Sequence, residues 1–226
     1  MSAVPSIQAL GLSGRHALVA GTTGGFVPEL CAVLAAAGAR VTLAAGDGGE
    51  ARGIVARLHG AGHAARGHDP AAAGAPDALV AEALASAGRL DILLSFASDG
   101  AGGAIAQASD EAWDRAMGAS LRARYLLCRA AGEAMKRGGG GRIVVVAGDA
   151  GMASARGLAG VEDGGALTMV RSFARDLGPH GIGANALVAG PSARPLDAAR
   201  AAAFLASPWA SYVAGHALVV GGEPLR

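Results

Sequence analysis

The fold is decided by one stretch near the start of the chain, His16-Ala17-Leu18-Val19-Ala20-Gly21-Thr22-Thr23-Gly24-Gly25-Phe26-Val27. Residues 16–20 form an apolar run of strand length, and the turn after them is rich in glycine. Residues 28–37 are predicted to be a helix, because Pro28 suits a first turn and Gly38 suits the position after the last one. A strand, a glycine turn and a helix in this order predict the first unit of an α/β fold.

Short apolar runs alternate with helix-length segments along the rest of the chain. Further strands are predicted at 40–45, 63–67, 91–97, 142–147, 182–188 and 217–220, and further helices at 50–59, 76–87, 110–137, 158–177 and 197–206, with Ser109 as N-cap of the longest. This alternation predicts a doubly wound, Rossmann-like parallel sheet of about seven strands with helices on both faces. Since neither a repeat nor a linker interrupts it, residues 1–226 are expected to form one domain.

Composition narrows the class of partner and compartment. Hydrophobic residues make up 52% of the chain but aromatic residues only 4%, and 19 basic residues nearly balance 18 acidic ones. This balance predicts binding neither to nucleic acid nor to anionic membranes. Cys31 and Cys128 are expected to be buried free thiols, which suits a reducing compartment. Residues 1–14 lack a basic segment followed by an apolar one, and no apolar run reaches transmembrane length, so we expect a cytoplasmic protein.

From about residue 10 to 222 the chain resembles the short-chain dehydrogenase/reductase family. The motifs that carry this resemblance occur in the family's order and spacing: Leu12-Ser13-Gly14-Arg15, Gly88-Arg89-Leu90-Asp91-Ile92-Leu93, Gly141-Arg142-Ile143-Val144, Gly181-Ile182-Gly183-Ala184-Asn185-Ala186, and Ser211-Tyr212-Val213-Ala214-Gly215 through Gly221-Gly222. The resemblance implies a dinucleotide bound at the glycine turn. It also implies catalysis by a Tyr, a Lys four residues later, a Ser and an Asn.

The cofactor motifs of the family are eroded in this chain. Of the glycines in its TGxxxGxG turn, Gly21 and Gly25 remain, while Val27 replaces the last one. The family has an acid or an Arg after the second strand, but this chain has Ala45-Gly46 there, with Asp47 one or two positions too far along. The stretch Ser95-Phe96-Ala97-Ser98 replaces the family's NNAG motif, and Ala189-Gly190 replaces its PG motif. Asp69 matches the acid on the adenine side. We interpret Gly21, Gly25 and Asp69 as vestigial, and expect no cofactor to be bound by this chain.

The catalytic positions hold no acid, base or activated nucleophile. Alignment on the fifth strand places Gly148 at the Ser position, Val161 and Gly165 at the Tyr and Lys positions, and Ser120 at the Asn position. The two tyrosines, at 125 and 212, and the single lysine, at 136, form no YxxxK pair in any register. The segment 190–206 is also short for a substrate-covering loop. The family's chemistry is therefore predicted to be absent.

Other polar residues allow different chemistry. Asp149, Glu162 and Asp163 fall near the vacated positions as a possible carboxylate set, although we favour solvated side chains or caps of the helix that begins near Leu158. His59, His63 and His68 lack a fourth ligand, so no metal is expected; His180 is interpreted as a cation at a helix end.

Two long helices carry the remaining signal. Residues 110–137 combine an apolar stripe with a basic one: the apolar stripe is formed by Trp113, Met117, Leu121, Tyr125, Cys128 and Met135, and the basic stripe by Arg115, Arg122, Arg129 and Lys136. Residues 158–178 carry a second apolar stripe, formed by Leu167, Val170, Phe173 and Leu177. Three glycines, Gly160, Gly164 and Gly165, lie near the start of this second helix. In the family that the chain resembles, these helices typically build the subunit interface.

The resulting hypothesis is a non-catalytic subunit that assembles through these helices with an active homologous dehydrogenase, as a heterotetramer, with NAD or NADP in the active partner. By analogy alone, it resembles the inactive subunit of heteromeric enzymes such as the hydroxybenzylsuccinyl-CoA type, acting on a hydroxyacyl-CoA or a similar alcohol or ketone. Two alternatives stay open. One is a stand-alone ligand-binding or regulatory protein, and the other is an atypical oxidoreductase with relocated catalytic residues.

Overall fold

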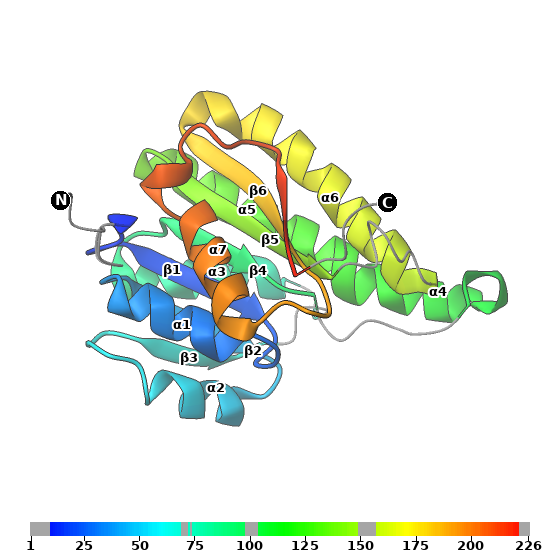
Figure 1. The fold of residues 1–226 in the computed structure, drawn as a ribbon, viewed down its shortest axis with the longest axis horizontal. Coiled ribbons are helices and arrows are strands. Elements are labelled where there is room, and N and C mark those ends of the chain that lie inside the picture. Colours follow the sequence, from blue (N-terminus) through cyan, green and yellow to red (C-terminus); the bar gives the residue numbers. More distant parts are fainter. Residues whose placement is uncertain (1–9, 69–71, 73, 98–103, 149–156, 222–226) are drawn as a thin grey trace.

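A seven-stranded, wholly parallel sheet forms the centre of the molecule (Figure 1). The structure, a computed structural model, describes residues 10–68, 72, 74–97, 104–148 and 157–221. The strands lie in the order β3-β2-β1-β4-β5-β6-β7. Their bounds are β1 His16–Gly21, β2 Arg40–Ala45, β3 Ala64–Gly67, β4 Ile92–Ser95, β5 Gly141–Gly148, β6 Ile182–Ala189 and β7 Ala217–Val220. The predicted doubly wound sheet is confirmed.

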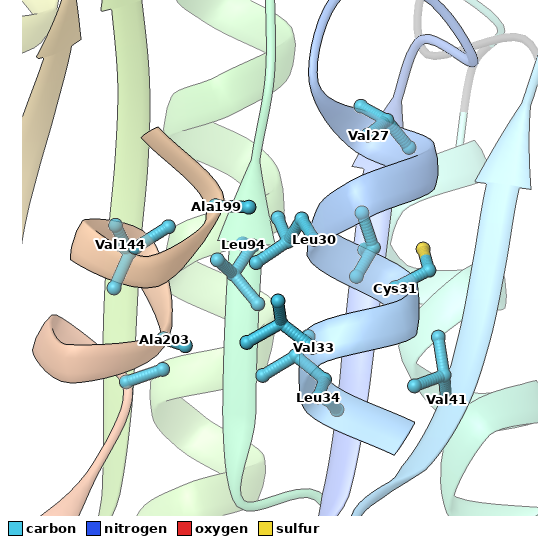
Figure 2. Packing of buried hydrophobic residues seen from close by; sticks show 14 of the residues in the cluster. Val27, Leu30, Cys31, Val33, Leu34, Val41, Leu94, Val144, Ala199 and Ala203 are labelled. Carbon is cyan, nitrogen blue, oxygen red and sulfur yellow. The ribbon is translucent and has the colours of Figure 1, made fainter. Parts of the chain in front are cut away.

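Helices cover both faces of this sheet and bury two separate apolar clusters. The first face is covered by α1 (Val27–Ala36), α2 (Gly48–Val55) and α7 (Pro195–Leu205), and the second by α3 (Ala75–Ala87), α5 (Ala123–Gly138) and α6 (Gly157–Leu177). In Figure 1, α1 (blue) and α7 (orange) lie side by side in front of the sheet. Figure 2 shows Leu30 of α1 facing Leu94 of β4, with Ala199 of α7 near them. Small alanines on α7 let it pack this closely.

The predicted long helix is present but contains a wider turn. It begins as α4 (Asp110–Ala116), passes through a π-helical turn at η3 (Met117–Arg122), and continues as α5. Ser109 caps it, as predicted, because its Oγ accepts a hydrogen bond from the Ala112 N–H at 3.2 Å. Short 3₁₀ turns complete the fold at η2 (Ile105–Gln107), η5 (Gly178–His180) and η6 (Pro208–Ala210). No helix in the described ranges is long and apolar enough to cross a membrane.

Some residues of the two apolar stripes are buried in the core of the chain, and others are exposed to solvent. Trp113 and Tyr125 are 41% and 44% exposed, whereas Cys128 and Met135 are fully buried against the sheet. On α6, the residues Leu167, Val170 and Leu177 belong to the core on the second face and only Phe173 is half-buried. These core members of the two stripes pack on the sheet, whereas the role of the two helices in a subunit interface remains a prediction. Both cysteines are buried free thiols, as predicted.

Candidate functional site at the carboxyl edge of the sheet

The strand order reverses between β1 and β4, and a crevice at such a switch point is where doubly wound folds bind ligands. The glycine turn lies here. Gly21 has φ of +131°, and a Cβ atom added to it would lie 2.5 Å from the Phe96 carbonyl oxygen. Gly25 has φ of +61° with open space beside it. Both glycines are thus required by the backbone of the turn itself, whether or not a phosphate is bound.

Two aromatic rings from opposite sides of the crevice lie against each other. Phe26 precedes the first residue of α1, and Phe96 follows the last residue of β4. Their ring centroids are 5.3 Å apart at an interplanar angle of 56°, and both side chains are 8% exposed. Phe96 stands within the stretch that matches the family's NNAG motif. The aromatic contact thus joins the N-terminus of α1 to the end of β4, the two elements that flank the crevice.

Carboxylates surround the same turn. The Thr23 hydroxyl donates a short hydrogen bond to Glu50 Oε2 of α2. Glu29 adds a second carboxylate in the first turn of α1, and its Oε2 is buried without a hydrogen-bond partner. Asp47 does not face a ribose position; it caps α2 by accepting hydrogen bonds from the Gly49 and Glu50 N–H groups at 2.6 and 3.2 Å. A helix N-terminus that would hold a pyrophosphate carries negative side chains instead.

Little space remains between the described residues of the crevice. The cavity there has a volume of about 10 Å³, which is room for about one water molecule. Its walls come from β1, β4, the π-helical turn and α5, and are formed by Ala20, Gly21, His68, Pro76, Ser95, Phe96, Ala119, Ala123, Arg124 and Leu127. This cavity by itself is too small for a dinucleotide.

The positions predicted to be vacated lie on β5, α6 and the π-helical turn. Gly148 ends β5, and a Cβ atom on it would lie 3.2 Å from Asp163 Oδ2 of α6. A Cβ atom on Gly165 would lie 2.8 Å from Leu121 Cδ2 in the π-helical turn. Val161 lies on α6 and Ser120 in the π-helical turn. Side chains of other elements thus pack close to both glycines.

The centre of this region is a buried cation, Arg124. Its guanidinium donates from Nη2 to Ser120 Oγ at 2.7 Å and from Nη1 to the Val146 carbonyl at 3.4 Å. Nη1 also lies 3.8 Å from Asp163 Oδ1. Burial lowers the pKa of Arg124 below its ordinary value, while Asp163 and Glu162 act in the opposite direction. One guanidinium and two carboxylates therefore form a buried charged cluster between α5 and α6.

The structure corrects our interpretation of these carboxylates. Glu162 and Asp163 are 2% and 7% exposed within α6, which begins at Gly157, so they are neither solvated nor helix caps. The reason is Arg124, which reaches them from another helix. Glu162 Oε1 is buried and has no hydrogen-bond partner. Asp149 and Asp69 lie outside the described residues.

The sequence analysis did not single out Arg124 or the ring pair. The sequence does contain an indication of a buried charge at Arg124, because this residue interrupts the apolar face formed by Ala123, Leu127 and Cys128. His63 accepts from the Val41 N–H through Nδ1 and contacts the His59 carbonyl through Nε2. No cluster of His, Cys, Asp or Glu suited to a metal occurs among the residues that the structure places.

Comparison with known proteins agrees with this geometry. A family model described as enoyl-(acyl carrier protein) reductase matches residues 25–198. D-threitol dehydrogenase of Mycolicibacterium smegmatis is 30% identical over 241 residues, which cover 93% of each chain. The chain belongs to the short-chain dehydrogenase/reductase family. Human dehydrogenase/reductase SDR family member 4 is 28% identical over 93% of this chain and 87% of its own. A crystal structure of a short chain dehydrogenase from Mycobacterium smegmatis superposes with a TM-score of 0.86 at 25% identity, covering 94% of both chains.

Members of this family are oxidoreductases that normally bind NAD(P). In this member the family's strand order and glycine turn are kept. The assignment of Gly148, Val161, Gly165 and Ser120 to the positions of the family's catalytic Ser, Tyr, Lys and Asn remains a prediction from the sequence. A protonated Tyr beside a Lys supplies acid–base catalysis in the family, and neither group is present here.

Proposed function

We propose that this chain is a non-catalytic subunit that binds no dinucleotide and supports an active homologous dehydrogenase. The observation that carries the proposal is the Arg124 cluster, in which a guanidinium and carboxylates lie beside the positions predicted for the catalytic side chains. Arginine stays protonated at any physiological pH and is a poor acid or base. The cluster therefore favours a structural role over proton transfer.

The crevice supports the same proposal. The Phe26–Phe96 contact, the Thr23–Glu50 hydrogen bond and Val27 each replace a feature that a dinucleotide requires. We expect NAD⁺, NADH, NADP⁺ and NADPH to leave the melting temperature of this chain unchanged, while they raise that of an active homologue used as positive control. A saturable rise in this chain would contradict this part of the proposal. It would favour the alternative of a stand-alone ligand-binding or regulatory protein.

The proposed partner surface lies on the second face, where α4, α5 and α6 meet. Tyr125 stacks on Phe173 with ring centroids 6.1 Å apart, and the Arg129 guanidinium lies 5.9 Å from the centre of the Tyr125 ring. Trp113 extends this aromatic surface along α4. Exposed aromatic residues beside an arginine are typical of the centre of protein interfaces. We name Trp113, Tyr125 and Phe173 the aromatic surface.

The basic stripe contributes less to this surface than its spacing predicted. Arg129 lies 3.8 Å from Asp77 Oδ2, and Lys136 donates to Glu133 at 2.7 Å. These two cations are thus paired within the chain. The partner is expected to meet the aromatic rings first, with Arg115 and Arg122 at the rim.

A second exposed apolar region supports a tetramer. Trp209 is 53% exposed in η6, Tyr212 is fully exposed after it, and Val219 is 38% exposed on the edge strand β7. A tetramer built from two-fold axes needs two different interfaces on each chain. The aromatic surface and this C-terminal region supply two such surfaces. We propose that the assembly is a heterotetramer of two inactive and two active chains.

The substrate of the assembly would be an alcohol or ketone. This rests on the relative described as D-threitol dehydrogenase and on analogy with heteromeric dehydrogenases of hydroxyacyl-CoA thioesters. The cofactor, NAD or NADP, would be bound by the active partner. The buried free cysteines suit assembly in the cytoplasm, where thiols stay reduced.

Co-expression with an intact YxxxK homologue tests the assembly. We expect the two chains to co-purify, and expect Tyr125→Glu to abolish co-purification, because it places a charge at the centre of the aromatic surface. Arg57→Glu, an exposed change beyond the end of α2, is the control and should leave the complex intact. A stable homo-oligomer of this chain that ignores every such homologue would refute the proposal.

The same complex tests the relocated-chemistry alternative. Glu162→Gln removes one buried carboxylate charge with little change of volume. If this chain is non-catalytic, turnover by the complex stays within about twofold of the unmodified complex, whereas loss of a catalytic acid or base typically costs 10² or more. A loss of that size, with assembly intact, would favour relocated catalysis.

A further inference from the structure

A larger cavity lies at the opposite, amino edge of the sheet. Its volume is about 190 Å³, far more than that of the crevice at the carboxyl edge. The walls come from the segments that precede β1, β4 and β6, from the start of β5, and from the residues after α7. They are formed by Arg15, Arg89, Asp91, Gly138, Gly139, Gly140, Gly141, Arg142, Gly181, Ala206 and Pro208.

The side chains around this cavity carry an excess of positive charge. Three guanidinium groups and one carboxylate line it, a net charge of +2. The carboxylate, Asp91, is held mainly by Arg89, which donates to its two oxygens from Nε at 2.7 Å and from Nη2 at 2.5 Å. The backbone N–H of His16 also donates to Asp91 at 2.9 Å. Arg89 and Arg15 share the single carboxylate of Asp91, so a net charge of +2 remains around the cavity.

The net positive charge is clearest at Arg142. Its Nη1 donates only to backbone carbonyls, those of Gly141 at 2.8 Å and Gly181 at 3.4 Å. Its Nε is buried and has no hydrogen-bond partner. Burial and the nearby charge of Arg15 both lower the pKa of Arg142. Arg15 itself lies 3.5 Å from Asp91 and donates to the Gly11 carbonyl, so two repelling cations face one cavity.

Glycines keep the cavity open. Gly138–141 and Gly181 give walls without side chains, and a Cβ atom on Gly140 would lie 3.0 Å from the Gly181 carbonyl oxygen. The C-terminus of α5 carries partial negative charge that opposes an anion, so the guanidinium groups must outweigh it; the Lys136 and Met135 carbonyls there accept from the Gly139 and Gly140 N–H groups. Residues 1–9, next to Arg15 in the sequence, contain no Asp or Glu that could neutralise it.

We propose that this cavity binds a phosphate dianion, either inorganic phosphate or the phosphoryl group of a small phosphomonoester, between Arg15 and Arg142. The dianion matches the net charge of +2, and guanidinium groups recognise phosphate oxygens through paired hydrogen bonds. Arg15 is partly exposed and Arg142 half-buried, and both line the cavity, so guanidinium donors come from two sides of it. The site is on the edge of the sheet opposite the crevice, so it stands or falls independently of the function proposed above.

Titration of the intact chain with inorganic phosphate tests this site. At constant ionic strength set with chloride, we expect a saturable signal in calorimetry and a rise in melting temperature of about 3 °C at tenfold excess over the dissociation constant. O-phosphoserine serves as the phosphomonoester probe; tighter binding of O-phosphoserine than of phosphate would identify an organic ligand as the source of the group.

Two variants locate the bound ion. Arg142→Gln and Arg15→Gln are each expected to weaken phosphate binding at least tenfold, while Arg57→Gln, far from the cavity in the fold, leaves it unchanged. Arg15 is partly exposed, so its variant keeps the test valid if the half-buried Arg142 variant fails to fold. Three results would overturn the proposal: no saturable binding of phosphate, equal binding of chloride, or phosphate binding that survives both variants.

Discussion

Replacement of Arg124 by methionine is the sharpest test of the buried cluster. The change removes the hydrogen bond to Ser120 and the ion pair with Asp163, and it takes the nearby positive charge away from two buried carboxylates, Glu162 and Asp163. Breaking a buried pair costs about 3–5 kcal/mol. The ion pair is long at 3.8 Å, so we expect the lower end, a loss of about 3 kcal/mol in the free energy of unfolding. For a chain of this size that loss lowers the melting temperature by roughly 6–12 °C.

Urea denaturation followed by far-UV circular dichroism measures this loss. Arg122→Met, on the exposed side of the same helix, is the matched control and should change the free energy of unfolding by less than about 0.5 kcal/mol. The double variant with Asp163→Asn should cost about 1–2 kcal/mol less than the sum of the two single variants, because each partner alone is left uncompensated. If Arg124→Met unfolds at the wild-type urea concentration, or if the two changes are additive, the cluster does not hold α5 to α6.

Three further predictions concern a glycine pair, the thiols and a histidine. Gly164→Ala should stabilise the chain by about 1 kcal/mol by helix propensity, whereas Gly165→Ala should be about 1–2 kcal/mol less stable than Gly164→Ala because its Cβ meets Leu121. The urea midpoints of the two variants measure this difference, and equal midpoints would contradict the close contact. Burial raises the pKa of both cysteines to about 12, so Ellman's reagent at pH 8 should react with neither until denaturant is added, and fast reaction in the native state would show that the packing is wrong. Burial lowers the pKa of His16, so the free energy of unfolding should be highest above about pH 6.5 and should fall as the pH drops through and below that value. In His16→Gln, urea midpoints measured between pH 8 and 5 should fall less steeply, and an unchanged slope would exclude His16 as the cause of the fall.

Most of the fold could be predicted because its signals are local. Strand-length apolar runs, the glycine turn and the cap at Ser109 are properties of neighbouring residues, and the structure places them where expected. The π-helical turn was not predicted, since no residue type marks it; it depends on how both halves of the helix pack. The division of the two stripes between core and exposed surface could not be predicted for a related reason. Periodicity identifies an apolar face but does not say whether a sheet or a partner covers it.

The absence of a YxxxK pair could be read from the sequence, whereas the buried charged cluster and the contact between the two rings could not. A single lysine that forms no YxxxK pair excludes the family's catalysis on sequence alone. The burial of Glu162 and Asp163 depends on a cation 38 positions away in the chain, and spacing does not reveal such a contact. The contact of Phe26 with Phe96 is equally long-range. Contacts between distant elements, rather than the properties of single residues, define both regions.

The π-helical turn at Met117–Arg122 also bears on how this surface arose. In a regular helix, residues 12 positions apart point about 120° away from each other, so Trp113 and Tyr125 would lie on different sides. A π turn accommodates one extra residue, which reduces that angle to roughly 20° and aligns the two rings. Deleting one residue there would restore a regular helix without rotating either flank. The turn thus has the form of a single-codon insertion, which a lineage can gain or lose while both flanking helices keep their neighbours.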